Sequence, residues 1–172
     1  DELEEIRDRI KRKLEKLKEE TKRTLEEDRK SLDDNRRKTE EALRRDRESL
    51  ERIERAKIPS DKIREVLERN KTELRKIFER SREDLRRNKE RLKKANEDAK
   101  KKIEDLREEI KKNNLDRDIL EELTRLLDKL RRDHERVSEE SKRRNDELEE
   151  ENRRVLKESE DRNRELEERL RQ

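Results

Sequence analysis

The sequence of 172 residues contains no cysteine, glycine, methionine, tryptophan or tyrosine, and only one proline, one phenylalanine and one histidine. Without cysteine there is no disulfide, zinc–thiolate site or thiol nucleophile. Without glycine there is neither a P-loop nor a dinucleotide-binding fingerprint, since both need glycine to approach phosphate closely. One phenylalanine cannot form the stacking platform that binds single-stranded nucleic acid. These absences exclude several common catalytic and nucleotide-binding sites.

Apolar side chains are also scarce. Hydrophobic residues make up 23% of the chain, and no apolar run approaches the ~18 residues needed to span a bilayer. Charged residues make up 63%, and 56 basic residues nearly cancel 53 acidic ones, which leaves a net charge of +3. The two signs are mixed, often at i,i+4 spacing, which stabilises a helix, whereas a nucleic-acid-binding surface gathers its basic residues on one face. We therefore expect an ordered helical protein that binds neither nucleic acid nor a membrane.

Three long segments carry the apolar residues that are present. In each segment Leu, Ile, Val and small polar residues recur at steps of three and four, a spacing typical of one continuous helix. Nearly equal helices joined by short loops fold back as antiparallel neighbours. We expect an all-α fold: an antiparallel up-down-up three-helix bundle of long, nearly straight helices. The expected single domain covers residues 1–172, with helices over about 1–57, 61–112 and 117–171.

The connections between the segments carry helix-ending and helix-starting residues. Pro59 ends the first helix because proline cannot continue one, and Ser60 is expected to cap the second helix. Residues 113–114, both asparagine, tolerate the left-handed conformation that ends helices and stand in for the absent glycine. At the start of the third helix, Leu115 and Leu120 have the spacing of a hydrophobic staple.

The pattern repeats every eighteen residues. Asp28 recurs as Asp46, and the polar residues of the segment 141–145 recur at 159–163. Eighteen residues make five turns of an α-helix at 3.6 residues per turn. A face that repeats at this interval neither drifts around the helix nor supercoils. The repeat therefore predicts straight helices with polar side chains at regular heights.

Antiparallel packing brings polar residues of all three helices to common heights. For two residues at the same height, one on the first helix and one on the second, the residue numbers then add up to about 116. A residue of the third helix at that height has a number about 116 larger than its neighbour on the first helix. Because an unpaired buried polar group costs about 1–3 kcal/mol, these residues suit the core only as members of satisfied networks. Such networks fix the register of the helices; the alternative is that the residues face solvent beside the core. The candidates for the networks are Thr21, Asp28, Ser31, Asn35, Asp46, Ser49, Asn70, Ser81, Asn88, Asn96, His134, Ser141, Asn145, Asn152, Ser159 and Asn163.

No combination of residues predicts catalysis. His134 has no further metal ligands at the spacing of a helical di-metal site, so we interpret it as a network member that could also titrate near neutral pH if buried. Ser138 lies on the same helical face, but an uninterrupted helix offers no oxyanion hole. Asp28 and Asp46 are about 27 Å apart along one helix, too far for glycoside hydrolysis. We expect no catalytic residue, no metal and no cofactor.

With these repeats, the copied segment at 159–163 and a surface of Lys, Arg and Glu, the whole chain resembles de novo designed, parametrically generated helical bundles with buried hydrogen-bond networks. The absence of Gly, Met, Cys, Trp and Tyr adds to the resemblance. It implies a structural scaffold without natural ligand, activity or location. Such a chain is expected in the cytoplasm of an expression host, and its first residues do not resemble a signal peptide.

The sequence allows several interpretations, which differ in the role of the polar residues. The leading interpretation is a monomeric scaffold that requires no partner. The alternative is an interaction module, which self-associates as a homo-oligomer or pairs with a designed partner chain through its polar seams. A natural charged single helix would lack capped breaks, and a spectrin-like rod would carry aromatic core residues. A weak nucleic-acid binder would show salt-dependent binding.

Overall fold

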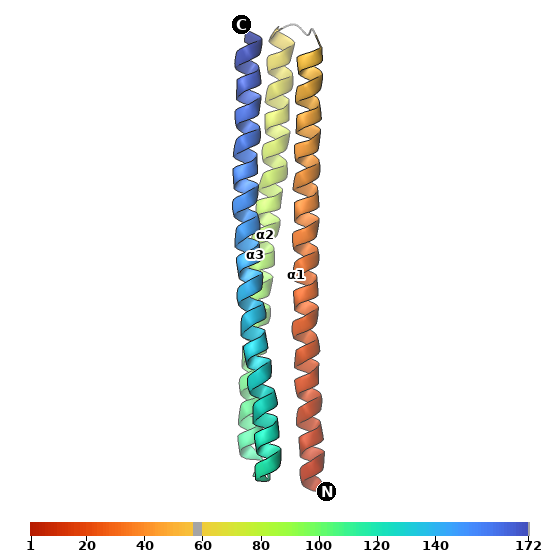
Figure 1. The fold of residues 1–172 in the computed structure, drawn as a ribbon, viewed down its shortest axis with the longest axis vertical. Coiled ribbons are helices and arrows are strands. Elements are labelled where there is room, and N and C mark those ends of the chain that lie inside the picture. Colours follow the sequence, from red (N-terminus) through yellow and green to blue (C-terminus); the bar gives the residue numbers. More distant parts are fainter. Residues whose placement is uncertain (57–59, 172) are drawn as a thin grey trace. The chain divides into compact units, whose positions relative to one another are not determined.

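The computed structural model describes residues 1–56 and 60–171 (Figure 1). These residues form three long helices and no strand: α1 (Glu2–Arg55), α2 (Ser60–Lys112) and α3 (Arg117–Arg171). The predicted fold class is confirmed, because the three helices pack as an all-α antiparallel bundle. The expected roles of Pro59 and of the Ser60 side chain lie outside the described part of the chain.

The charges at the helix ends match the direction of the helix dipole. The first turn of α1 carries Glu2, Glu4 and Glu5, and its last turn carries Arg52 and Arg55. The first turns of α2 and α3 each carry one aspartate, Asp61 and Asp118, and their last turns carry basic residues. Acidic groups near an N-terminus and basic groups near a C-terminus each stabilise a helix by about 0.3–1 kcal/mol. The ends of the helices are therefore specified locally, in addition to the packing of their apolar faces.

The chain divides into two compact units, and each contains a stretch of all three helices. The first unit consists of Asp1–Lys30 and Asn88–Arg143, and the second of Ser31–Arg87 and Arg144–Gln172. Each unit buries apolar side chains of its own. That residues 1–172 form a single domain stays a prediction.

The first unit has one continuous apolar core. Ile10 and Leu123 are completely buried in it, and the other residues come from all three helices. Burying a leucine or isoleucine side chain stabilises a fold by about 1.5–3 kcal/mol relative to leaving it exposed. The buried residues of this core are Ile10, Leu14, Leu17, Ile103, Leu106, Ile110, Leu123, Leu127 and Leu130.

One residue expected in this core lies outside it. The Leu120 side chain is 38% exposed, so its expected position on the inward face of the third helix is wrong, whereas its staple contact with Leu115 stays a prediction. Ile119 and Leu115 pack against the core instead. The reason is geometric: Ile119 continues the series through Leu123 and Leu127 at steps of four, whereas the next residue is rotated by about 100° away from that face.

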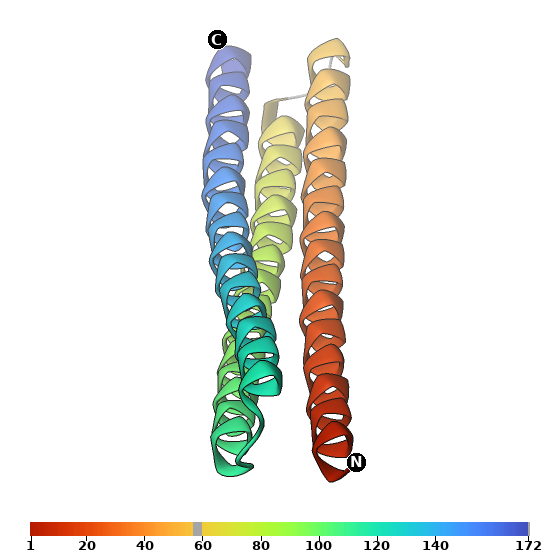
Figure 2. The same cartoon turned by 60° about the horizontal axis from the view of Figure 1, so that its bottom comes forward.

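The connection between α2 and α3 follows the expectation for asparagine (Figure 2, green to teal). Asn114 has a positive φ of 36°, which is the left-handed conformation that ends many helices. The Asn113 side chain caps α2 differently, because its Nδ2 donates a hydrogen bond to the Glu109 carbonyl oxygen at 2.7 Å. The Leu120 amide donates to the Asp116 carbonyl oxygen at 2.9 Å, which starts α3.

The second unit divides its apolar residues among three separate clusters. Leu32, Leu85 and Leu148 form one cluster with one residue from each helix. Ala42, with Leu74 and Phe78, forms another, and the half-buried Val155 and Leu156 of α3 pack against it. The third cluster is formed by Ile53, Ile63, Leu67 and Leu166. Buried polar side chains lie between these clusters on α1 and α3, and on α2 the half-buried Asn70 and the buried Ser81 do so. Apolar and polar layers therefore alternate.

The difference between the two leucines at the start of α3 can be measured. We expect Leu123→Ala to lower the free energy of unfolding by about 2–5 kcal/mol, because it leaves a cavity in the core. Leu120→Ala is the matched control and should change it by about 0.5 kcal/mol, since that side chain is largely exposed. Urea titrations followed by circular dichroism compare the two. Equal losses would show that Leu120 is part of the core after all.

Candidate functional site: the polar side chains of the core

The sixteen polar candidates are all at least half-buried. The buried ones are Asp28, Asn35, Asp46, Ser81, Asn88, His134, Ser141, Asn145, Asn152, Ser159 and Asn163. The half-buried ones are Thr21, Ser31, Ser49, Asn70 and Asn96. The list of network candidates omitted one buried polar residue, Thr39, although its position eighteen residues after Thr21 places it on the inward face of the helix. Thr39 needs no partner on another helix, because its hydroxyl donates to the Arg36 carbonyl oxygen at 2.9 Å.

In the second unit, one chain of hydrogen bonds connects all three helices. Asn152 on α3 donates through Nδ2 to Oδ1 of Asn35 on α1 at 3.0 Å. Asn35 in turn donates through Nδ2 to the carbonyl oxygen of Ser81 on α2, also at 3.0 Å. All three residues are buried. The Asn35 amide is therefore used on both sides, once as acceptor and once as donor.

Asp46 and Asn163 form a second polar contact in this unit. Asn163 Nδ2 lies 3.3 and 3.4 Å from the two carboxylate oxygens of Asp46, and it also donates to the Ser159 carbonyl oxygen at 2.8 Å. Burial raises the pKa of the Asp46 carboxyl above its usual range, although the Asn163 hydrogen bond and the charges of Arg162 and Arg47 oppose this effect. Removing the carboxylate from water therefore outweighs the favourable contacts of its charged form.

A third contact lies nearer the edge of the second unit. Asn70 Nδ2 on α2 donates to Ser49 Oγ on α1 at 2.7 Å, and both residues are half-buried. Two polar atoms of the unit make no hydrogen bond with a described residue, namely Ser81 Oγ and Asn163 Oδ1. The polar layers are therefore largely but not completely satisfied by protein groups.

The first unit contains a contact between α1 and α2. Asn88 Nδ2 donates to Asp28 Oδ1 at 2.7 Å, and both side chains are buried. Arg91, one turn further along α2, donates to Asn88 Oδ1. The arginine therefore places a positive charge at the partly buried end of this contact, next to the amide of Asn88.

The residue numbers predict Ser31, Ser141 and Asn145 at the height of this contact, but only Ser141 belongs to the same unit. Ser141, which is buried, lies in the first unit with Asp28 and Asn88. Asn145 is completely buried and Ser31 half-buried, and both lie in the second unit.

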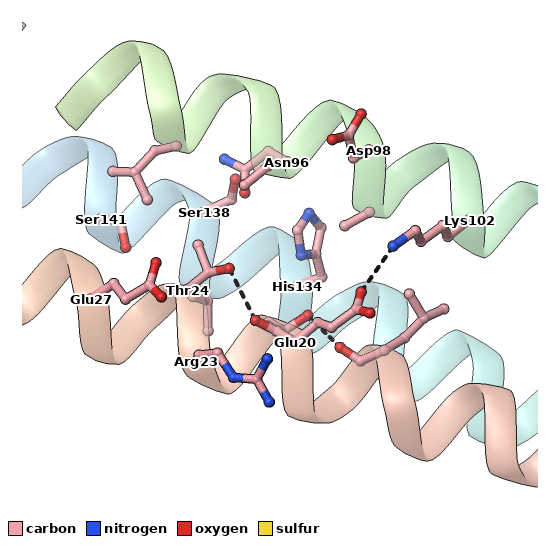
Figure 3. A pocket seen from close by; sticks show the side chains of 16 residues that line it. Glu20, Arg23, Thr24, Glu27, Asn96, Asp98, Lys102, His134, Ser138 and Ser141 are labelled. Carbon is pink, nitrogen blue, oxygen red and sulfur yellow. Dashed lines mark hydrogen bonds and ion pairs between the residues drawn. The ribbon is translucent and has the colours of Figure 1, made fainter. Parts of the chain in front are cut away.

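His134 lies in a cavity of about 350 Å³ in the first unit (Figure 3). Thr21 of α1 and Asn96 of α2, predicted at the same height, line this cavity with it. The His134 side chain is 4% exposed, and neither of its ring nitrogens has a hydrogen-bond partner among the described residues. The threonine hydroxyls are not available as donors to it, because Thr21 donates to the Leu17 carbonyl oxygen at 3.0 Å and Thr24 to that of Glu20 at 2.9 Å.

Burial lowers the pKa of the His134 imidazole below its usual value of 6.5. The backbone of Asn96 and the negative charge of Glu135 oppose this effect, because both favour the charged ring. The positive charge of Lys100 adds to the effect of burial. The ring is therefore neutral at pH 7, with one nitrogen that donates and one that accepts.

The described residues contain no group of three or more His, Cys, Asp or Glu side chains that could hold a metal ion. Within the same residues, no helix has an apolar stretch that could cross a bilayer. Ser138 lines the cavity together with His134, but no hydrogen bond joins the serine hydroxyl to the ring. A serine nucleophile would need that hydrogen bond to be activated.

Comparisons with known proteins show a similarity to solved structures but none to a protein family. No protein-family model matches the sequence, and no curated protein matches it. Among solved structures, the chain is similar to a computationally designed three-helix bundle, with 18% sequence identity and a TM-score of 0.46. The matched region covers 98% of this chain and 88% of that chain. At this identity and TM-score, the similarity places no constraint on the function.

The lowered pKa of His134 predicts that stability depends on pH. The unfolded chain takes up a proton near the usual pKa of 6.5, whereas the folded chain takes it up only at lower pH. As pH falls below 6.5, the unfolded state is therefore favoured and the urea midpoint decreases until the folded pKa is passed. Urea titrations between pH 7.5 and 5.5 should show this decrease, and His134→Leu should lack it. An NMR titration in which the ring has a pKa of 6.5 or above would contradict the expectation.

The raised pKa of Asp46 predicts the opposite dependence. Its folded pKa lies above 3.8, so its contribution to stability is present below pH 3.8 and is lost as pH rises through the folded pKa. Asp46→Asn is neutral at every pH and keeps an oxygen to accept from Asn163. We therefore expect the stability of this variant relative to the parent to rise between pH 3 and pH 7. Asp33→Asn, an exposed aspartate, is the control, and an equal rise there would rule out burial as the cause.

Proposed function

We propose that the chain is a designed structural scaffold without natural biochemical activity, and that the polar residues of its core fix the register of the helices. The observation that carries the proposal is the chain of hydrogen bonds from Asn152 through Asn35 to the Ser81 backbone. It connects positions that are 117 and 46 residues apart in sequence. These contacts form only when all three helices have one alignment.

The register argument follows from distances. Sliding a helix by one turn moves its side chains by about 5.4 Å, which is more than a hydrogen bond at 3.0 Å can tolerate. A shifted apolar layer would still find apolar neighbours, but a shifted asparagine would lose its partner in a dry environment. Each stranded group costs about 1–3 kcal/mol. Apolar burial alone gives similar free energies to helix alignments that differ by one turn. The polar layers therefore favour one of these alignments over the others.

The eighteen-residue repeat supports a parametric origin of the helices, in which one unit was copied along straight rods. The copies are similar in burial but differ in their partners. Asp28 accepts from Asn88 on α2, whereas Asp46 accepts from Asn163 on α3. Both aspartates are buried and both accept from an asparagine amide. The repeat thus supplies the same residue types at each height, and the local packing selects the partner.

The proposal can be tested by removing one polar layer completely. In the double variant Asn35→Leu/Asn152→Leu, both partners become apolar, so we expect a free energy of unfolding equal to or above that of the parent. The single variant Asn152→Leu should lose about 1–3 kcal/mol, because it leaves Asn35 Oδ1 without its partner. Spin labels at positions 36 and 151, which the Arg36–Glu151 ion pair brings together, report the register. We expect one narrow distance distribution in the parent and a broad or double one in the double variant.

Light scattering on the same samples separates a scaffold from an interaction module. A scaffold has the mass of one chain, 21.5 kDa, whereas a module that self-associates has a multiple of it. A distance distribution that stays narrow in the double variant, at unchanged mass, would mean that the asparagines do not fix the register.

A further inference from the structure

The three helices of the first unit can be arranged in two ways. Once α1 and α2 pack against each other, α3 can lie on either side of the pair, which gives two opposite windings of the bundle. Both windings bury the same inward faces, so the apolar core does not decide between them. They differ in which helix lies next to each edge of an inward face. The residues beside the core can therefore decide the winding.

The edge of α1 that faces α3 is basic. Lys11 Nζ lies 2.5 Å from Glu122 Oε1 of α3. This contact lowers the pKa of the Glu122 carboxyl, and the charge of Arg7 acts in the same direction. Residues seven and eleven positions apart lie within about 20° of each other on a helix, which adds two lysines to this edge. Its basic residues are Arg7, Lys11, Lys18 and Lys22.

Two acidic residues flank the basic edge of α1. Glu4 lies in the first turn of the helix, at the end of the edge. Glu15 comes four residues after Lys11 and is rotated by about 40° away from the core. Neither residue separates the basic side chains of the edge from the helix that packs beside it.

The edge of α2 that faces α3 is basic as well. Arg107 Nη2 lies 3.9 Å from Asp128 of α3, while its Nη1 lies 2.9 Å from Glu104 of α2 itself. Lys100, seven residues before Arg107, is close enough to His134 of α3 to lower the pKa of its ring. Two further lysines lie within about 40° of Arg107 around the helix. The basic residues of this edge are Lys93, Lys100, Arg107 and Lys111.

The edges of α1 and α2 that face each other pair opposite charges. The Glu109 carboxylate of α2 lies 3.2 Å from Arg9 Nη2 and 2.9 Å from Lys13 Nζ of α1. Lys102 Nζ of α2 lies 3.0 Å from Glu20 Oε2 of α1. With Lys11 and Glu122 on the other side, both edges of α1 meet opposite charges in the observed winding.

On α3, Asp133 and Glu140 follow Glu122 by eleven and eighteen residues. They lie within about 20° of it around the helix, so they face α1 as Glu122 does. Lys129 is the basic residue on this side, rotated by about 20° from Glu122 away from the core. The basic edge of α1 therefore has a mainly acidic neighbour in α3.

We propose that the charges beside the core select the winding of the first unit, because the opposite winding would bring the basic edges of α1 and α2 together. The like charges at matching heights would be Lys11 with Arg107, Lys18 with Lys100 and Lys22 with Lys93. One exposed pair contributes little, but these repulsions recur along the unit and all act against the same arrangement. Repulsion in the wrong structure is a common source of specificity.

This inference extends the proposed function, in which buried polar layers fix the alignment of the helices along their axes. The charges beside the core would fix the side on which α3 packs. The Asn35→Leu/Asn152→Leu variant leaves every one of these charges unchanged, so either idea can fail while the other holds.

Reversing the charges on α1 tests the proposal. The variant Arg7→Glu/Lys11→Glu/Lys18→Glu/Lys22→Glu makes this edge acidic, so the acidic side of α3 repels it and the basic edge of α2 attracts it. Spin labels on cysteines introduced at positions 20 and 102, which an ion pair brings together, report the winding. In the opposite winding both labels turn towards α3 instead of towards each other. We expect one short distance in the parent and a longer distance in the majority of the variant molecules.

The control reverses four basic residues on the exposed outer face of α1, in the variant Arg12→Glu/Lys16→Glu/Arg23→Glu/Lys30→Glu. It changes the net charge equally and should keep the short distance. Circular dichroism checks folding. If the fourfold edge variant is unfolded, Lys11→Glu/Lys18→Glu carries the same labels, and the longer distance should appear in part of its molecules. The proposal is overturned if the folded edge variant keeps the parent distance, or if the control shifts as much.

Discussion

Satisfying buried amides and carboxylates is the constraint on which this fold depends. With 23% hydrophobic residues, the helices cannot form an unbroken apolar seam along their lengths, and Asn, Ser, Thr and Asp fill the intervening layers. Each of these groups loses its hydration when it is buried, and only a partner in the correct place offsets that loss. The contact of Asp28 with Asn88 and that of Asp46 with Asn163 show the same solution, an amide that donates to a buried carboxylate.

The two units meet this constraint in different ways. The first has a continuous apolar core of nine buried residues and one open polar cavity at His134. The second spreads its apolar residues over three small clusters and places polar contacts between them. Small clusters bury less surface, and in the second unit hydrogen bonds between buried polar side chains lie beside them. The exposed ion pairs between helices, such as that of Lys13 with Glu109 at 2.9 Å, add little stability, because both groups remain near solvent.

Much of this arrangement could be predicted from the sequence, because helical periodicity and antiparallel packing follow from spacing alone. The heights of Asn35, Ser81 and Asn152 came from residue numbers, and the hydrogen bonds between them are present. Spacing could not decide which neighbour a polar side chain selects, since that depends on rotamers and on the distance between helices. Nor could it separate Ile119 from Leu120 at a helix start, where one residue shifts the face by about 100°. The cavity at His134 was also unpredictable, because missing volume leaves no pattern in a sequence.

The turn at Asn114 has a consequence for the unfolded chain. In most proteins a glycine would occupy this left-handed position, but here an asparagine with a φ of 36° does so, in a chain that contains no glycine at all. Asparagine samples fewer backbone conformations than glycine before folding, so fewer are lost when the turn forms. The hairpin of α2 and α3 therefore closes with a smaller loss of entropy, and the folded turn holds a small amount of steric strain in exchange.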